Sequence, residues 1–114
     1  MPSFRHGDVV RVTFPYTDRS TRQHRPALVL SKGGIGEGND LLWVAKITSA
    51  ENRARPGDVP FGEQFRKAGL PAPSVIRSCK LATIEARRAQ PLGRIAPALM
   101  REVEAALRGY LGVQ

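Results

Sequence analysis

The chain has 114 residues, which suits one domain and leaves no room for two, so we expect residues 1–114 to form a single domain. Hydrophobic residues make up 41% of the chain and charged residues 25%, which excludes an intrinsically disordered composition. Lys and Arg total 18 against 10 Asp and Glu, so the formal net charge is +8. A surface of that charge attracts polyanions such as RNA, DNA or acidic protein segments.

Cysteine content and hydropathy narrow the class of protein further. Cys79 is the single cysteine, so an internal disulfide is excluded and a zinc site is not indicated. No stretch approaches the roughly 18 apolar residues that cross a bilayer. Residues 1–8 lack the charged and apolar pattern of a signal peptide. We therefore expect a cytoplasmic protein with no membrane attachment.

The N-terminal third predicts two strands separated by a long polar loop. Apolar side chains alternate from Val9 to Phe14, which is typical of a half-buried strand. Residues 16–24 are polar, and a loop of that length is often functional. Residues 27–30 are apolar on both faces and indicate a central strand, with Pro26 at its first position.

The middle third predicts one strand and several irregular segments. Residues 33–40 contain four glycines but no phosphate-binding motif, and we expect a mobile hairpin loop. Residues 41–48 form the third predicted strand. Residues 51–60 are polar and interrupted by Pro and Gly, which indicates a loop. Residues 62–68 suit a short helix or turn, and the prolines at 71 and 73 exclude regular structure there.

The C-terminal third predicts strands followed by the clearest helix of the chain. Residues 75–84 suit one strand with an irregularity near Cys79, and residues 92–95 suit a last short strand. Pro97 to Leu111 carries an apolar face for packing, from Leu99 to Tyr110 or Leu111, and Gly112 is a natural stop. Five or six strands with one C-terminal helix predict a mainly β fold, a small antiparallel barrel.

The residue types favour chemistry without a metal or cofactor. The two histidines, His6 and His24, have no metal-ligand spacing, and the carboxylates are scattered. Cleavage of RNA needs no metal, because its 2′-hydroxyl can attack the neighbouring phosphorus. The protein then has to assist two proton transfers and stabilise negative charge on the phosphate oxygens, and arginine, lysine and hydroxyl side chains suit that charge stabilisation.

Four segments, in order, resemble the MazF/PemK family of type II toxin–antitoxin endoribonuclease toxins. They are residues 7–14 with 24–31, the Ile-Thr-Ser at 47–49, residues 74–84, and Gly-Arg-Ile at 93–95 followed by the final helix. The most specific piece is the Arg-Pro at 25–26, which precedes an apolar strand ending in Ser. The similarity spans nearly the whole chain.

The resemblance implies both a fold and an activity. The fold would be an SH3-like barrel of the MazF/PemK/CcdB type that forms a homodimer. The activity would be sequence-specific cleavage of single-stranded RNA, mRNA in particular, without metal and through a 2′,3′-cyclic phosphate. The resemblance also implies a cognate antitoxin, whose acidic C-terminal segment occupies the RNA groove.

Matched position by position, the resemblance implies that Arg25 and Thr48 are the catalytic pair. Arg77 would contact the scissile phosphate. The chain departs from one branch of the family at Cys79, where many members have an Asp proposed to transfer protons. A neutral thiol is a poor substitute for a carboxylate base, so the departure favours Arg25 and Thr48 as carriers of the chemistry or weakens the activity.

Further side chains have a functional and a structural interpretation. We place Ser49, Lys80 and His24 among the substrate contacts, although His24 and its neighbour on a strand point to opposite faces. Arg77 could instead pair with Glu63 or Glu85. Trp43 suits the core or a dimer interface better than a platform for base stacking, and Cys79 suits a half-buried filler.

Two other functions stay open at this stage. A barrel of this kind can grip RNA or DNA without cutting it, because one fold hosts many functions. Its basic surface could also serve only an acidic protein partner.

Overall fold

The computed structural model describes residues 3–13 and 24–113. Its strands form one antiparallel sheet in the order β4-β5-β3-β2-β1-β6, and a C-terminal helix, α1, packs against it. The elements are β1 (Asp8–Thr13), β2 (His24–Val29), β3 (Leu41–Ser49), β4 (Asp58–Pro60), β5 (Ser74–Glu85), β6 (Gln90–Arg94) and α1 (Pro97–Leu111). Three short 3-10 turns occur at Glu37–Asn39, Gly62–Phe65 and Ala86–Arg88.

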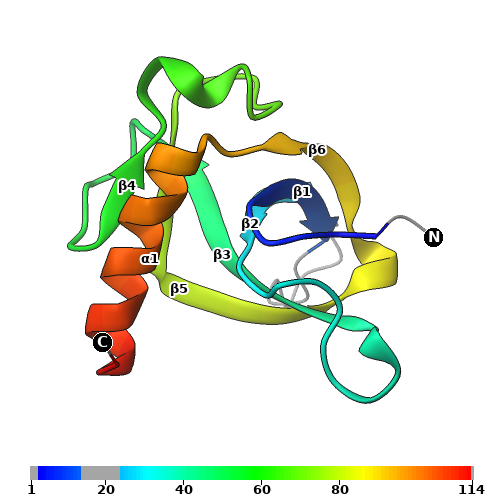
Figure 1. Cartoon of the computed structure of the whole chain (residues 1–114). Helices are drawn as coiled ribbons and strands as arrows, with labels where there is room; N and C mark the ends of the chain where they lie inside the picture. The colour runs from blue at the N-terminus through cyan, green and yellow to red at the C-terminus, as the bar shows by residue number, and fades with distance from the viewer. Residues whose placement is uncertain (1–2, 14–23, 114) are drawn as a thin grey trace.

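The sheet is strongly curved, and β5 and β6 lie on opposite sides of the short central strands β1 and β2 (Figure 1). Within the described residues the pairings run from β4 to β6 without joining these two end strands, and the barrel is therefore partly open. The predicted mainly β fold with a C-terminal helix is confirmed. No helix in the described ranges is long and apolar enough to span a membrane.

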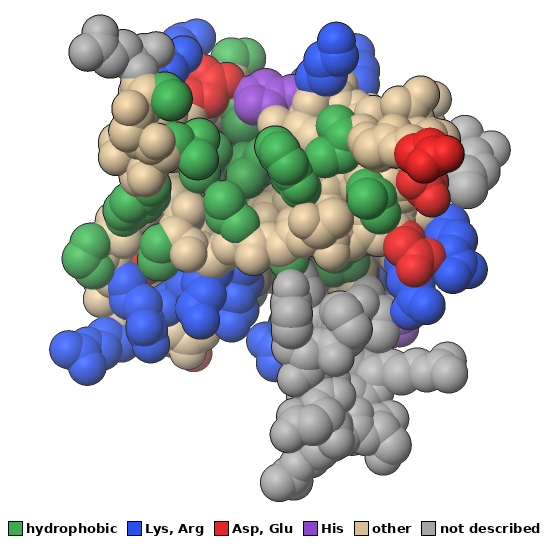
Figure 2. Space-filling view, turned by 90° about the horizontal axis from the view of Figure 1, so that it is seen from below, with side chains coloured by type: hydrophobic (Ala, Val, Ile, Leu, Met, Phe, Trp, Pro, Cys, Tyr) green, Lys and Arg blue, Asp and Glu red, His purple; other side chains and the backbone are tan. Residues whose placement is uncertain are grey.

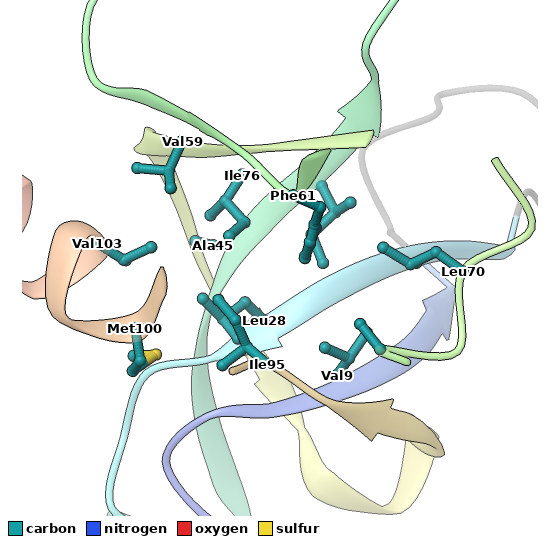
Figure 3. Packing of buried hydrophobic residues seen from close by; sticks show 12 residues of the cluster. Val9, Leu28, Ala45, Val59, Phe61, Leu70, Ile76, Ile95, Met100 and Val103 are labelled. Atoms are coloured by element: carbon teal, nitrogen blue, oxygen red, sulfur yellow. The ribbon is translucent and has the colours of Figure 1, made fainter. Parts of the chain in front are cut away.

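The larger core cluster fills the space between the sheet and α1. Leu28 of β2, Ile76 of β5 and Val103 of α1 are each fully buried there, and Phe61 enters from the loop after β4. Figure 3 shows these side chains converging from the strands and the helix. The helix thus lies along β4 and β5, on one side of the curled sheet.

A second cluster lies on the other face of the same strands. Val10, Val29 and Val44 are fully buried in it, whereas Val9 and Leu28 belong to the first cluster. Alternate residues therefore pack into different cores, because side chains alternate across a strand. This double burial explains the continuous apolar run predicted for the central strand.

Several sequence predictions are confirmed and some need correction. The helix has the predicted bounds, and Gly112 ends it in the left-handed conformation with φ 71°. Its apolar face packs only in part, since Tyr110 and Leu111 are exposed.

Residues 51–60 contain the short strand β4, although the sequence predicted a loop there. Phe14 and the loop predicted for residues 16–24 lie outside the described residues, apart from His24, which begins β2.

Pro26 is the third residue of β2 and not its first. It faces Arg11 of β1, and β2 begins to pair with β3 only at Ala27. A proline lacks the N–H that a two-sided ladder requires. The residue is tolerated in this inner strand because the pairing on the β3 side starts one residue later.

Candidate functional site

The first residues of β2 and the last residues of β3 lie at the same end of the sheet. Ala27 pairs with Lys46 at the end of this antiparallel ladder, so Arg25 and Thr48, each two residues further along its strand, lie at the same end of the two strands. Arg25 and Thr48 both line a hollow of about 490 Å³, here called the first hollow. The predicted catalytic pair therefore shares one concave surface.

The first hollow also receives two of the predicted substrate contacts, Ser49 and His24. The Ser49 hydroxyl accepts a 3.2 Å hydrogen bond from the backbone N–H of Glu51. The proline-rich segment before β5 also lines it. The complete lining is His24, Arg25, Pro26, Ile47, Thr48, Ser49, Asn52, Pro71, Ala72, Pro73 and Ser74.

Asn52 holds the Thr48 hydroxyl in place. Its side-chain Nδ2 donates a 2.6 Å hydrogen bond to Thr48 Oγ1. A hydroxyl that accepts one hydrogen bond can still donate its own proton to another acceptor. The Thr48 hydroxyl is thus available as a donor to an oxygen bound in the first hollow.

Lys46 lies two residues before Thr48, so both side chains belong to the same face of β3. It pairs with Ala27 on one side and with Arg77 of β5 on the other. Partial burial lowers the pKa of Lys46, and the nearby charges of Arg25, Arg77, Lys80 and Arg55 lower it further. Several cations therefore surround one amine beside the first hollow.

Arg77 is held by the protein itself. Its residue exposure is 6%, its Nη2 donates a 2.8 Å hydrogen bond to the Arg53 carbonyl, and its Nε lies 4.0 Å from Asp58 Oδ1. Asp58 is the cross-strand neighbour of Arg77 in β4. The alternative pairing of Arg77 with Glu63 or Glu85 is wrong, because the carboxylate beside it is that of Asp58 and Glu85 pairs with Arg87 and Arg88.

Opposite the β3 position between Ala45 and Lys46, strand β5 contains an irregularity. Lys46 pairs with Arg77, but Ala45 pairs with Leu81, so three residues of β5 (78–80) have no partner on β3. The irregularity predicted near Cys79 is therefore confirmed. Cys79 and Lys80 are exposed as a result, and the interpretation of Cys79 as a half-buried filler is wrong.

Cys79 lines a second hollow of about 480 Å³, separate from that of Arg25 and Thr48. Its other lining residues are Arg53, Ala54, Arg55, Pro56 and Tyr110. The Tyr110 hydroxyl donates a 3.0 Å hydrogen bond to the Pro56 carbonyl, which ties the end of α1 to the loop before β4. The position at which the MazF/PemK resemblance places an Asp thus belongs to a different hollow from the predicted catalytic pair.

Sequence analysis missed Lys46 and Asn52. Lys46 had a signal in the sequence, since it is a cation two residues before Thr48 on a predicted strand. Asn52 had none, because its contact with Thr48 depends on the turn after β3. Trp43 is 57% exposed, so its interpretation as a core residue is wrong and those as an interface or a stacking residue remain.

Comparisons with known proteins agree with this fold. A family model described as PemK-like, MazF-like toxin of type II toxin-antitoxin system matches residues 5–111. The chain resembles MazF from Deinococcus radiodurans at 24% identity, covering 99% of this chain and all of the other, with a TM-score of 0.78.

Two further structures are similar. One is the MazE-MazF complex (Form-II) from the same organism, with 24% identity, full coverage of both chains and a TM-score of 0.76. The other is an endoribonuclease in complex with its cognate antitoxin from Mycobacterial species, with 20% identity, coverage of 100% and 98%, and a TM-score of 0.74. No curated protein sequence matches the chain.

Proposed function

Because the chain belongs to the family of PemK-like, MazF-like toxins of type II toxin–antitoxin systems, we propose that it is an endoribonuclease that cuts single-stranded RNA without a metal ion. The observation that carries this proposal is that Arg25 and Thr48 line the same hollow. The net charge of +8 favours a polyanionic substrate.

The proposed reaction is an internal transfer within the RNA. The 2′-oxygen forms a bond to phosphorus, the bond from phosphorus to the 5′-oxygen breaks, and the products end in a 2′,3′-cyclic phosphate and a 5′-hydroxyl. The 2′-hydroxyl loses a proton and the leaving 5′-oxygen gains one. The Arg25 guanidinium and the Thr48 hydroxyl donate to the phosphate oxygens, where negative charge grows in the transition state.

The test is cleavage of a long single-stranded RNA in EDTA, followed by mapping of the ends. We expect discrete cuts with cyclic phosphate ends, and a loss on the order of 10²–10³ in rate for Arg25→Ala. Arg101→Ala, which removes an exposed arginine from α1, is the matched control and should cut normally. A single 2′-deoxynucleotide on the 5′ side of the cut should block it.

Two results would contradict the proposed nuclease. Cleavage that survives at the deoxynucleotide would exclude attack by the 2′-oxygen. RNA that shifts in a gel but stays intact would identify a binding module, the alternative for which the exposed Cys79 in place of an acidic residue leaves room.

We further propose that the protein pairs with a cognate antitoxin whose acidic segment competes with RNA for the same basic surface. The support is the family membership together with the cluster of cations around Lys46. Related MazF structures include complexes with MazE. A synthetic peptide rich in Asp and Glu should therefore inhibit cleavage competitively, and inhibition that no RNA concentration relieves would contradict the shared surface.

A homodimer is the proposed assembly. Trp43 of β3 and Leu81 of β5 are 57% and 49% exposed on neighbouring strands. Figure 2 shows apolar side chains in a band across one face of the molecule, with Lys and Arg on several sides of it. Large exposed apolar surfaces mark interaction sites. Light scattering should give a dimer that Trp43→Lys weakens and Trp43→Tyr preserves, and a monomeric parent protein would contradict this assembly.

A further inference from the structure

Lys46 occupies the middle of a row of cations that crosses three neighbouring strands. Arg25 lies at the start of β2, Lys46 on β3, and Arg77 and Lys80 on β5. The register sets Lys46 directly across from Arg77. Lys46 and Thr48 share a face of β3 and are separated by about 6.8 Å along the strand, a step comparable with one nucleotide of an extended RNA strand.

Positively charged side chains crowd around Lys46. Burial and four surrounding cations lower the pKa of this amine. Asp58 lies against Arg77, and both side chains are 8% exposed. The negative charge of Asp58 therefore balances the buried Arg77 guanidinium, whereas Lys46, Lys80 and Arg55 are in contact with solvent. Like charges gathered at a surface repel one another until an anion binds.

We propose that Lys46 binds the RNA phosphate adjacent to the scissile one, in a second phosphate subsite to which Lys80 and Arg55 contribute. This inference rests on the proposed nuclease activity and extends it. The row of cations would then set the path of the strand, from the first hollow across β3 toward the second hollow, which Arg53 and Arg55 line. RNA is favoured over an acidic peptide because its charges recur at every nucleotide, and the row begins at the predicted catalytic pair.

The experiment measures the salt dependence of binding to a single-stranded RNA that is 2′-O-methylated throughout and therefore cannot be cut. The logarithm of the binding constant falls linearly with the logarithm of salt concentration, by about 0.7 for each phosphate neutralised. We expect Lys46→Met to reduce this slope by about 0.7. Lys46→Arg should restore it, and the control Lys32→Met, which removes an exposed lysine beyond the other end of β2, should leave it unchanged.

The outcomes separate the inference from the proposed function. An unchanged slope for both Lys46→Met and Lys46→Gln, in variants whose circular dichroism matches that of the parent and which melt no lower than the parent, overturns the second subsite. A Lys46 variant that loses affinity for an acidic peptide but keeps its RNA slope also overturns it and assigns the subsite to the antitoxin. Failure of the parent protein to cut unmodified RNA would instead overturn the nuclease, whatever the slope.

Discussion

The hydrogen bond from Asn52 to Thr48 leads to a prediction about catalysis. Asn52 Nδ2 donates to Thr48 Oγ1 at 2.6 Å and leaves the hydroxyl proton of Thr48 to point elsewhere in the first hollow. In the proposed reaction the Thr48 hydroxyl donates a hydrogen bond to a phosphate oxygen and keeps its proton. Asn52 is therefore a positioning residue, which acts through Thr48 and does not touch the reacting atoms.

The expected change in kcat follows from the free energy that one such hydrogen bond contributes. A single intramolecular hydrogen bond contributes about 0.5–1.5 kcal/mol net. If Asn52→Ala removes that much stabilisation of the transition state, because the Thr48 hydroxyl is no longer oriented, kcat should fall roughly 2- to 13-fold. KM should change little, because the phosphate still meets Arg25. Asn52→Asp should lower kcat further, since a carboxylate accepts the Thr48 proton and repels the phosphate.

The assay is steady-state cleavage of a short fluorogenic RNA that contains the mapped cut site. Asn52→Ala is combined with Thr48→Ala in a double-mutant cycle. Once Thr48 has lost its hydroxyl, removal of the Asn52 amide should cost nothing more. Gln64→Ala, which truncates an exposed amide outside the first hollow, is the matched control.

Two results would refute the reasoning. Additive losses in the cycle would mean that Asn52 acts independently of Thr48. An Asn52→Asp variant as active as the parent would mean that Thr48 donates its proton to residue 52 and does not need it for the phosphate.

Three further predictions concern stability and titration. Gly69 has φ +84°, and a Cβ there would lie 2.1 Å from a carbonyl oxygen of β6. The free energy of unfolding in urea should therefore fall by at least about 1–2 kcal/mol in Gly69→Ala. It should rise by up to about 1 kcal/mol in Gly109→Ala, the matched change on the open surface of α1. A parent-like midpoint for Gly69→Ala would contradict this. The pKa of Lys46 is lowered in the folded protein, so its positive charge opposes folding at neutral pH, and this penalty fades as pH rises through that pKa. Lys46→Met should therefore raise the melting temperature at pH 7, and should raise it less above pH 10. An equal gain at both pH values would point to packing alone. The hydrogen bond and charge of Arg87 lower the pKa of the Glu85 carboxyl, so its NMR titration should move up in Arg87→Ala, and an unmoved curve would exclude the pair.

Local sequence patterns determine the elements that form from contacts within their own segment. The helix from Pro97 to Leu111 was predicted with its observed bounds, because its apolar spacing, the proline in its first turn and Gly112 at its end are all local signals. The strand β4 was missed, because its three residues carry no periodic pattern and become a strand only by pairing with β5.

The same division runs through the candidate site. The sequence, through its resemblance to the MazF/PemK family, pointed to Arg25, Thr48, Ser49 and His24. The sheet brings all four to the first hollow, and their roles stay predictions. Only the tertiary structure decided that Arg77 is buried against Asp58 and that Lys46 stands among the cations. The physical reason is that cross-strand neighbours are set by register, and the three unpaired residues of β5 shift that register in a way that no local preference encodes.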